Sequence, residues 1–214
     1  MPTLVCFALK EEAAPFHKIA AAHPGVFTLV TGIGRRNAGQ SVRNFLPSCS
    51  PGLVLTCGFA GGLGPDLKIG DVVFELASPA ASFQELAEKL SAAGAKPVKF
   101  FCADRIATTA AEKQKLRAET GADAVEMESA AIHAVCAERG IPCATVRVIS
   151  DPASEDLPLD FNALSKPDKS LGMGKLFLAV ARSPGKIGAL VALQKRAKFA
   201  AAQLAATLGL VVSH

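Results

Sequence analysis

The sequence predicts an α/β fold, with a mixed, largely parallel central sheet flanked by helices and a helical C-terminal segment. Two observations support this prediction. Short apolar runs rich in β-branched residues alternate with helical patterns, and half of the 214 residues are apolar, which suffices for one sizeable core. No Pro/Gly/Ser-rich linker divides the chain, so we expect a single domain over residues 1–214.

Seven apolar runs have the length and composition of strands, at residues 3–9, 27–31, 53–57, 71–77, 98–102, 122–127 and 143–149. Helical periodicity is clearest at residues 83–93, 110–120 and 129–139. Ser129 can cap the last of these helices at its start, and Gly140 and Pro142 end it. Beyond Pro158 the pattern is mainly helical.

Charge and composition exclude several classes of function. Residues 165–214 contain eight Lys or Arg against one Asp, in a chain of net charge +4. The chain lacks Trp and Tyr and has no recognition motif, so no nucleic-acid partner is expected despite this basic segment. The apolar runs are too short to span a bilayer, and the start has no basic region or cleavage site, which predicts a cytoplasmic protein.

The sequence gives no sign of a metal or a cofactor. Its six cysteines lack CxxC or Cys/His ligand spacing, so we expect free core thiols. Gly32 and Gly34 resemble the start of a dinucleotide-binding fingerprint, but Asn37 occupies the third glycine position. An NAD-dependent dehydrogenase is therefore disfavoured.

Acids and glycines follow the predicted strands, where open α/β sheets bind their ligands. Glu12 follows the first strand, a glycine-rich turn follows the third, and Asp151 ends the seventh. Glu126 and Glu128 end the sixth. Because residues two apart on a strand point to the same side, both carboxylates can face one ligand, and such a pair suits a sugar diol.

Five stretches resemble the nucleoside phosphorylase and nucleosidase superfamily, most closely its methylthioadenosine/S-adenosylhomocysteine nucleosidase branch. They are ALKEEAAPF (8–16), TGIG (31–34), TCGFAGGLGPDLKIGDVV (56–73), ADAVEMESAAIHAVC (122–136) and VRVISDPA (146–153). They keep the order found in that family. The resemblance implies cleavage of the N-glycosidic bond of a purine nucleoside of the adenine type.

The resemblance also implies roles for individual residues. A purine is a poor leaving group as an anion, and Asp151 would protonate it at N7, with Ser150 beside it and Arg147 supporting the strand end. Glu12 would activate water, and Glu128 would hold the ribose hydroxyls. The implied substrate-binding residues are Gly58, Phe59, Ala60, Ile106, Ala107, Glu126, Met127 under the ribose, Glu128, Arg147 and Ser150.

Two departures from the family pattern concern the nucleophile. Phosphorylases of the superfamily bind phosphate with Arg and Ser near the third-strand glycines, where this chain has Thr56 and Phe59. A carboxylate at Glu12 would also repel phosphate, so hydrolysis is favoured. Phosphorolysis stays open as an alternative, because Gly34, Arg35 and Arg36 could hold an anion. No metal is implied.

Further departures concern the substrate. The connection from GDVV to VEMES is short, and Ile106 occupies the position of an aromatic residue that stacks on the purine. With the tail at residues 181–204, these features resemble a bacterial subgroup, the hopanoid-associated nucleoside phosphorylases, which act on adenosylhopane. The basic segment 165–214 would then contact the inner face of the membrane peripherally.

The resemblance implies a homo-oligomer, a dimer or larger. A non-catalytic nucleoside-binding protein of the same fold remains an alternative, since Phe59 replaces a polar site residue. Intact Glu12, Glu128 and Asp151 argue against it.

Overall fold

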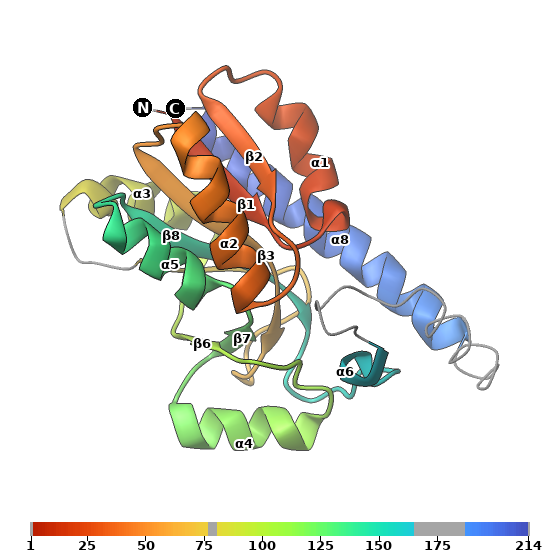
Figure 1. Ribbon diagram of the computed structural model, residues 1–214. Helices are drawn as coiled ribbons and strands as arrows, with labels where there is room; N and C mark the ends of the chain where they lie inside the picture. Colours follow the sequence, from red (N-terminus) through yellow and green to blue (C-terminus); the bar gives the residue numbers. More distant parts are fainter. Residues whose placement is uncertain (1, 77–80, 165–186, 214) are drawn as a thin grey trace.

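The computed structural model describes residues 2–76, 81–164 and 187–213, and its strands form one eight-stranded sheet between two layers of helices (Figure 1). The sheet has the order β2-β1-β3-β8-β4-β5, and β7 joins it beside β3 with β6 at its outer edge. Its strands are β1 (Thr3–Phe7), β2 (Val26–Val30), β3 (Leu53–Gly62), β4 (Val72–Leu76), β5 (Lys96–Pro97), β6 (Phe100–Cys102), β7 (Ala124–Glu126) and β8 (Cys143–Asp151).

The sheet is mixed but largely parallel, which confirms the predicted fold class. β1 runs parallel to β2 and β3, and β3 runs parallel to β8, whereas β4 is antiparallel to β8 and β7 is antiparallel to β3. The central strands β3 and β8 are buried along most of their length. Such strands read as continuous apolar runs because helices cover both faces of the sheet.

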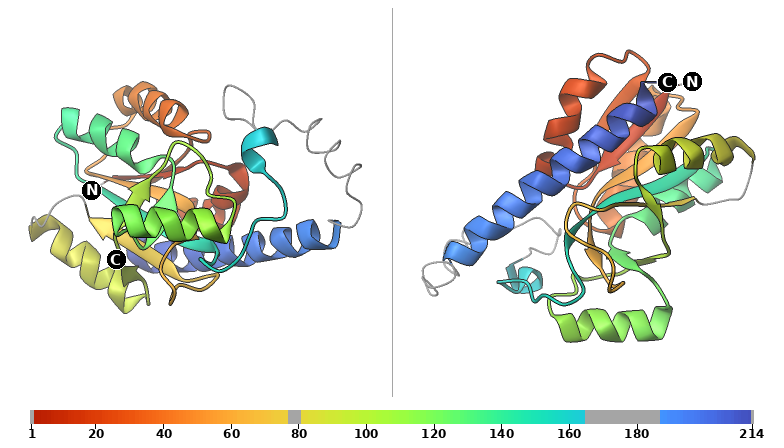
Figure 2. Two further views of the ribbon diagram at one scale, coloured as in Figure 1. Left: turned by 90° about the horizontal axis from the view of Figure 1, so that it is seen from below. Right: turned by 180° about the vertical axis from the view of Figure 1, so that it is seen from behind.

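Helices cover the two faces in separate groups (Figure 2). One face carries α1, α3 and α8, and the other carries α2 and α5. Their bounds, with those of α4, the short α6 and a 3₁₀ turn, are α1 (Lys10–Ala20), α2 (Arg35–Phe45), η1 (Leu46–Ser48), α3 (Ala81–Ala92), α4 (Ala110–Thr120), α5 (Ser129–Glu138), α6 (Phe161–Leu164) and α8 (Ile187–Val212).

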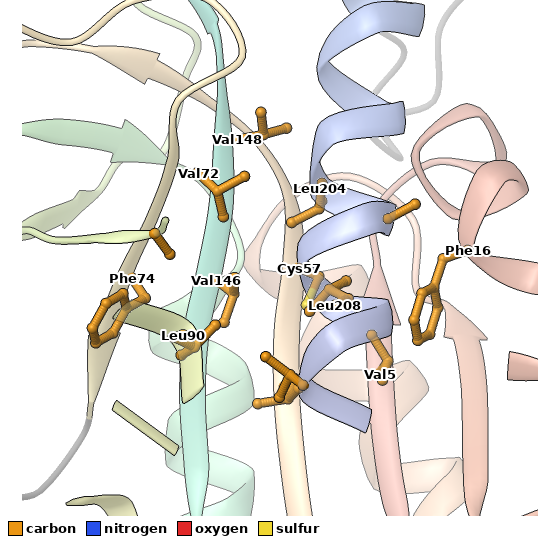
Figure 3. Close-up of a cluster of buried hydrophobic side chains, with 14 of the residues drawn as sticks. Val5, Phe16, Cys57, Val72, Phe74, Leu90, Val146, Val148, Leu204 and Leu208 are labelled. Atoms are coloured by element: carbon orange, nitrogen blue, oxygen red, sulfur yellow. The ribbon is translucent and has the colours of Figure 1, made fainter. Parts of the chain in front are cut away.

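The larger core lies beneath α8. Leu204 and Leu208 point from this helix toward Val5, Phe16 and Cys57, and the cluster continues across β8 and β4 (Figure 3). These side chains are almost completely inaccessible to solvent. The helical pattern predicted beyond residue 158 is present in α6 and α8, while residues 165–186 lie outside the described residues.

Several strand boundaries differ from the prediction. The strand predicted at 98–102 is shortened to β6, and β5 is a separate two-residue strand before it, at the edge of the sheet, where Pro97 is tolerated although it lacks an N–H. β3 continues to Gly62 and β8 continues to Asp151, because the two strands keep pairing up to Gly61 and Asp151. The glycine-rich turn and Asp151 are thus held by the sheet.

Candidate active site

A cavity of about 300 Å³ lies at the carboxyl ends of β1, β3 and β8, beside the end of β7. Glu12, Glu128 and Asp151 reach it from three separate parts of the chain. Of the predicted site residues, those that line it are Glu12, Phe59, Ala60, Ile106, Ala107, Glu126, Met127, Glu128, Ser150 and Asp151.

Glu12 sits in the first turn of α1 and is almost fully buried. Its carboxylate accepts two backbone hydrogen bonds of 2.8 Å, from the N–H of Leu9 to Oε2 and from the N–H of Phe59 to Oε1. Burial raises the pKa of Glu12 from 4.5 to about 7, although Arg147 and the two N–H donors act in the opposite direction. A carboxyl with this pKa can exchange a proton near neutral pH.

Gly58 makes the close approach of two charged groups feasible. Its backbone has φ of +142°, and a Cβ there would lie 2.7 Å from Oε1 of Glu12 and 2.9 Å from a guanidinium nitrogen of Arg147. Any larger residue would force these groups apart. Gly58 therefore shapes the wall behind the cavity and is absent from its lining.

Arg147 lies behind the cavity, on β8, and is one of the largest fully buried side chains. Its guanidinium pairs with Glu126 at 2.6 Å and with Glu128 at 3.3 Å, and donates to the hydroxyl of Thr56 at 3.1 Å. Burial opposes its charge, but Glu126, Glu128 and Glu12 together raise the pKa of Arg147 above its ordinary value. It is thus a permanent cation that keeps several carboxylates together.

Glu126 lines the cavity beside Glu128, as the sequence predicts, but its oxygens are engaged in this internal network. Oε2 accepts the N–H groups of Glu128 and Ser129, and Oε1 accepts the Ser129 hydroxyl. Burial disfavours its charge, but Arg147 and these donors outweigh burial and lower the pKa of Glu126. The prediction that Ser129 caps α5 is wrong. Its hydroxyl donates to Glu126, and α5 has no side-chain cap.

Glu128 is the carboxylate better placed for a ligand. Oε1 accepts the N–H of Gly34 at 2.8 Å, which fixes the side chain between α5 and the turn after β2. Burial, only partly offset by Arg147, raises the pKa of Glu128. Met127, whose side chain is also buried, lines the cavity next to it.

Asp151 is held by both of its oxygens. Oδ1 accepts the Ser150 hydroxyl at 2.6 Å, and Oδ2 lies 2.6 Å from Nζ of Lys113. Lys113 is not among the site residues predicted from the sequence, since it occurs among other charged residues of α4 and lysines are rarely buried. No feature of the sequence distinguishes it from its exposed neighbour Lys115.

The remaining walls are apolar and come from segments distant in sequence. Ile106 and Ala107 precede α4, and Asn162 of α6 fixes Ile106 through two hydrogen bonds of 2.9 Å. Leu193 and Ala197 of α8 complete the lining. The basic sequence of this segment predicted a contact with the membrane, and nothing in it indicated a place in the cavity wall.

The predicted anion-binding group is not part of the cavity. The N–H of Gly34 is used by Glu128, Arg35 reaches the carbonyl of Cys102 and pairs with Asp104 at 3.4 Å, and Arg36 is exposed. Among the described residues, no group of three His, Cys, Asp or Glu could hold a metal ion. Within the same part of the chain, no helix is long and apolar enough to cross a membrane.

A family model described as the phosphorylase superfamily matches residues 75–170. The chain is 26% identical over 195 residues to the aminodeoxyfutalosine nucleosidase of Helicobacter pylori, covering 76% of this chain and 84% of that protein. It is 29% identical over 182 residues to the 5'-methylthioadenosine/S-adenosylhomocysteine nucleosidase of Shewanella halifaxensis, covering 67% of this chain and 76% of that protein.

Solved structures of such nucleosidases share the fold. The Helicobacter pylori 5'-methylthioadenosine/S-adenosylhomocysteine nucleosidase with butyl-thio-DADMe-Immucillin-A has a TM-score of 0.72 at 21% identity, covering 100% of this chain and 98% of that chain. The Neisseria meningitidis enzyme with methylthio-immucillin-A has a TM-score of 0.71 at 20% identity, covering 99% and 98%. In its fold, its family match and its relatives, the chain resembles the nucleoside phosphorylase and nucleosidase superfamily.

Proposed function

We propose that the protein is an N-glycosidase that hydrolyses the bond between adenine and the ribose of a nucleoside. One observation carries the proposal: Glu12, Glu128 and Asp151 line a single cavity whose volume lies in the range of small-molecule sites. Both curated relatives described above are nucleosidases by name, which supports the same reaction class.

Each acid has a distinct task in this reaction. Asp151 protonates N7 of the purine as the bond from C1′ to N9 breaks, so that the base leaves neutral. Glu12 takes a proton from the water that attacks C1′, and Glu128 accepts hydrogen bonds from the ribose hydroxyls. The sugar carries positive charge in the transition state, and the ionised forms of Glu12 and Glu128 stabilise it.

The charges around the cavity favour water over phosphate. Among the described lining residues Arg105 is the single cation, and it pairs with Glu112 at 2.6 Å. Arg147 and Lys113 behind the lining are likewise paired with carboxylates. A phosphate dianion at C1′ would therefore meet Glu12 without an unpaired cation to offset the repulsion.

Adenine release tests the reaction. The protein is incubated with methylthioadenosine, S-adenosylhomocysteine or aminodeoxyfutalosine in phosphate-free buffer and with added phosphate, and the products are separated by liquid chromatography. We expect adenine and a free ribosyl product in both buffers. Strict dependence on phosphate, with a ribosyl 1-phosphate product, would return Arg35 and Arg36 to consideration. Nucleoside binding without adenine release would identify a non-catalytic binding protein.

The acid is tested by Asp151→Asn, which keeps the shape of the side chain and removes its proton. Turnover should fall by roughly 10²- to 10⁴-fold, with the affinity for free adenine changed far less. Asp66→Asn, at an exposed position, is the matched control. Near-normal turnover of Asp151→Asn would remove Asp151 from the mechanism.

We further propose that the substrate carries a large apolar 5′ group, as adenosylhopane does. Leu157, Phe161, Leu193 and Ala197 give the cavity an apolar wall, which supports this substrate class. On α8, Val191 and Phe199 are exposed apolar residues and Lys195 and Lys198 are exposed cations. Each such cation contributes about 1 kcal/mol near an anionic membrane surface. The preceding basic stretch 166–186 lies outside the described residues.

A paired assay tests the substrate class. Adenine release is measured from adenosylhopane in vesicles and from methylthioadenosine in buffer, together with flotation of the protein with anionic vesicles at low and high salt. We expect the higher kcat/KM for adenosylhopane, and flotation that salt weakens. A much higher kcat/KM for methylthioadenosine without salt-sensitive flotation would overturn the lipid substrate and the peripheral membrane location. Light scattering after gel filtration would test the homo-oligomer that we also propose.

A further inference from the structure

Lys113 is the one buried residue of α4, whose other residues are exposed or half-buried and which lies below the β6–β7 pair (Figure 1). Its side chain is 0% exposed, whereas that of Lys115, two residues further along the same helix, is 75% exposed. Burying an ammonium group is costly unless it is paired and hydrogen-bonded. The position of Lys113 therefore calls for a specific partner.

All three donors of Lys113 are used, on the last residue of β8 and on the chain that follows it. Nζ donates to the carbonyl of Pro152 at 2.8 Å and to the carbonyl of Glu155 at 2.9 Å, and lies 2.6 Å from Oδ2 of Asp151. The two carbonyls fix the ammonium before any ligand arrives. The ammonium in turn fixes Oδ2, while the Ser150 hydroxyl fixes Oδ1.

We propose that Lys113 is a positioning residue for protonation of the leaving purine, acting through Asp151. The inference rests on the proposed function and adds a second group to its acid. Lys113 holds the carboxyl plane of Asp151 toward the cavity, and its charge stabilises the carboxylate that forms when the proton departs. Preorganised charge of this kind favours the transition state over the bound substrate.

The proton balance of the step is complete. Asp151, which pairs with Lys113 as a carboxylate, takes up a proton from solvent when the purine binds. Its O–H bond then breaks as the bond from N7 to hydrogen forms, and the electron pair of the C1′–N9 bond goes to the purine. Asp151 then carries the negative charge beside the Lys113 ammonium, which keeps its own protons. Water adds to C1′ while Glu12 takes its proton, and exchange with solvent returns Asp151 and Glu12 to their starting states.

A purely structural role makes a different prediction from this proposal. If Lys113 only tied the chain after β8 to α4, its loss would damage the reaction of every substrate alike. If it acts through the acid, its loss matters only where the leaving group needs a proton. The two cases are separated by comparing leaving groups on the same sugar.

The experiment compares methylthioadenosine with the 4-nitrophenyl glycoside of 5-methylthioribose, whose 4-nitrophenolate leaves as a stable anion without protonation. The variants are Lys113→Met, Lys113→Arg, Asp151→Asn and the exposed control Lys115→Met. The readout is the ratio of kcat/KM for the two substrates in one preparation. This ratio is independent of the folded fraction, so a poorly folding variant remains informative.

For Lys113→Met we expect the ratio to fall by roughly 10²-fold, through the loss of one preorganised charge. Asp151→Asn should show the same pattern, and the double variant should be no worse than Asp151→Asn alone because the two act as a unit. Lys113→Arg, which keeps the charge, should recover much of the ratio, and Lys115→Met should leave it unchanged.

Other outcomes would refute either the role of Lys113 or the proposed function, and each outcome shows which of the two fails. An unchanged ratio in Lys113→Met with a lowered ratio in Asp151→Asn would refute the role of Lys113 and leave the proposed function intact. An unchanged ratio in both variants would refute the assignment of Asp151 as the acid. No release of adenine from methylthioadenosine or from adenosylhopane by the unmodified protein at any pH would refute the choice of reaction.

Discussion

Replacement of Glu12 by Gln should change how the stability of the protein depends on pH. Folding raises the pKa of Glu12 from 4.5 to about 7 through burial, so between these values the folded protein binds a proton that the unfolded chain has lost. Stability then falls as pH rises through this interval. At about 1.4 kcal/mol per pH unit, the contribution of Glu12 amounts to roughly 3 kcal/mol.

Gln cannot titrate, so this slope should disappear in the variant. The substitution has a second cost, because the amide group can accept only one of the N–H groups of Leu9 and Phe59 that the carboxylate now accepts. An unsatisfied buried N–H costs about 1–3 kcal/mol. That cost is the same at every pH, so it lowers the free energy of unfolding uniformly and does not change its dependence on pH.

Urea unfolding at intervals from pH 5 to pH 8 measures the effect. The stability of the unmodified protein relative to Glu12→Gln should decline toward neutral pH and level off above about 7. Glu11→Gln, at the exposed neighbouring position, should follow the unmodified protein at every pH. Parallel curves for Glu12→Gln and the unmodified protein would refute the reasoning that burial holds a proton on this carboxyl.

Four further predictions concern activity and packing. Because water activation needs ionised Glu12, kcat/KM should fall about tenfold per pH unit below about 7, and a flat profile would contradict that role. Glu128→Gln should weaken binding of a nucleoside analogue more than binding of free adenine in calorimetric titrations, whereas equal losses would argue against contact with the sugar. Gly58→Ala places a Cβ 2.7 Å from Oε1 of Glu12 and should lower kcat/KM by roughly 10²-fold, so unchanged kinetics would contradict the close approach. Leu204→Ala should cost about 2–5 kcal/mol in the free energy of unfolding, and a loss below about 1 kcal/mol would mean that α8 contributes little to the core.

The sheet could be predicted because its central strands are buried on both faces and therefore read as uninterrupted apolar runs. Their order could not be read in the same way, since strand pairing depends on contacts between distant segments. The location of the site followed from the rule that ligands bind at the carboxyl ends of strands. That rule led to Glu12, Glu128 and Asp151 without any knowledge of the pairing.

The ion pairs inside the site could not be predicted from the sequence. Spacing suggested that Glu126 and Glu128 would act as a pair, but spacing does not say which carboxylate a buried cation will engage. Arg147 engages Glu126 more closely, at 2.6 Å against 3.3 Å for Glu128. Lys113 could not be predicted either, because a pattern of charged residues on a helix ordinarily indicates a solvated surface.

Helix α8 has its two halves in different surroundings. Leu204 and Leu208 belong to the main core, while Leu193 and Ala197, several turns earlier, belong to the cavity wall. A ligand in the cavity thus contacts the same helix that packs against the core. By linkage, occupancy should slow amide hydrogen exchange along the whole helix, well beyond the turns that contact the ligand. A substitution in α8 that lowers the free energy of unfolding would then also weaken the binding of a nucleoside.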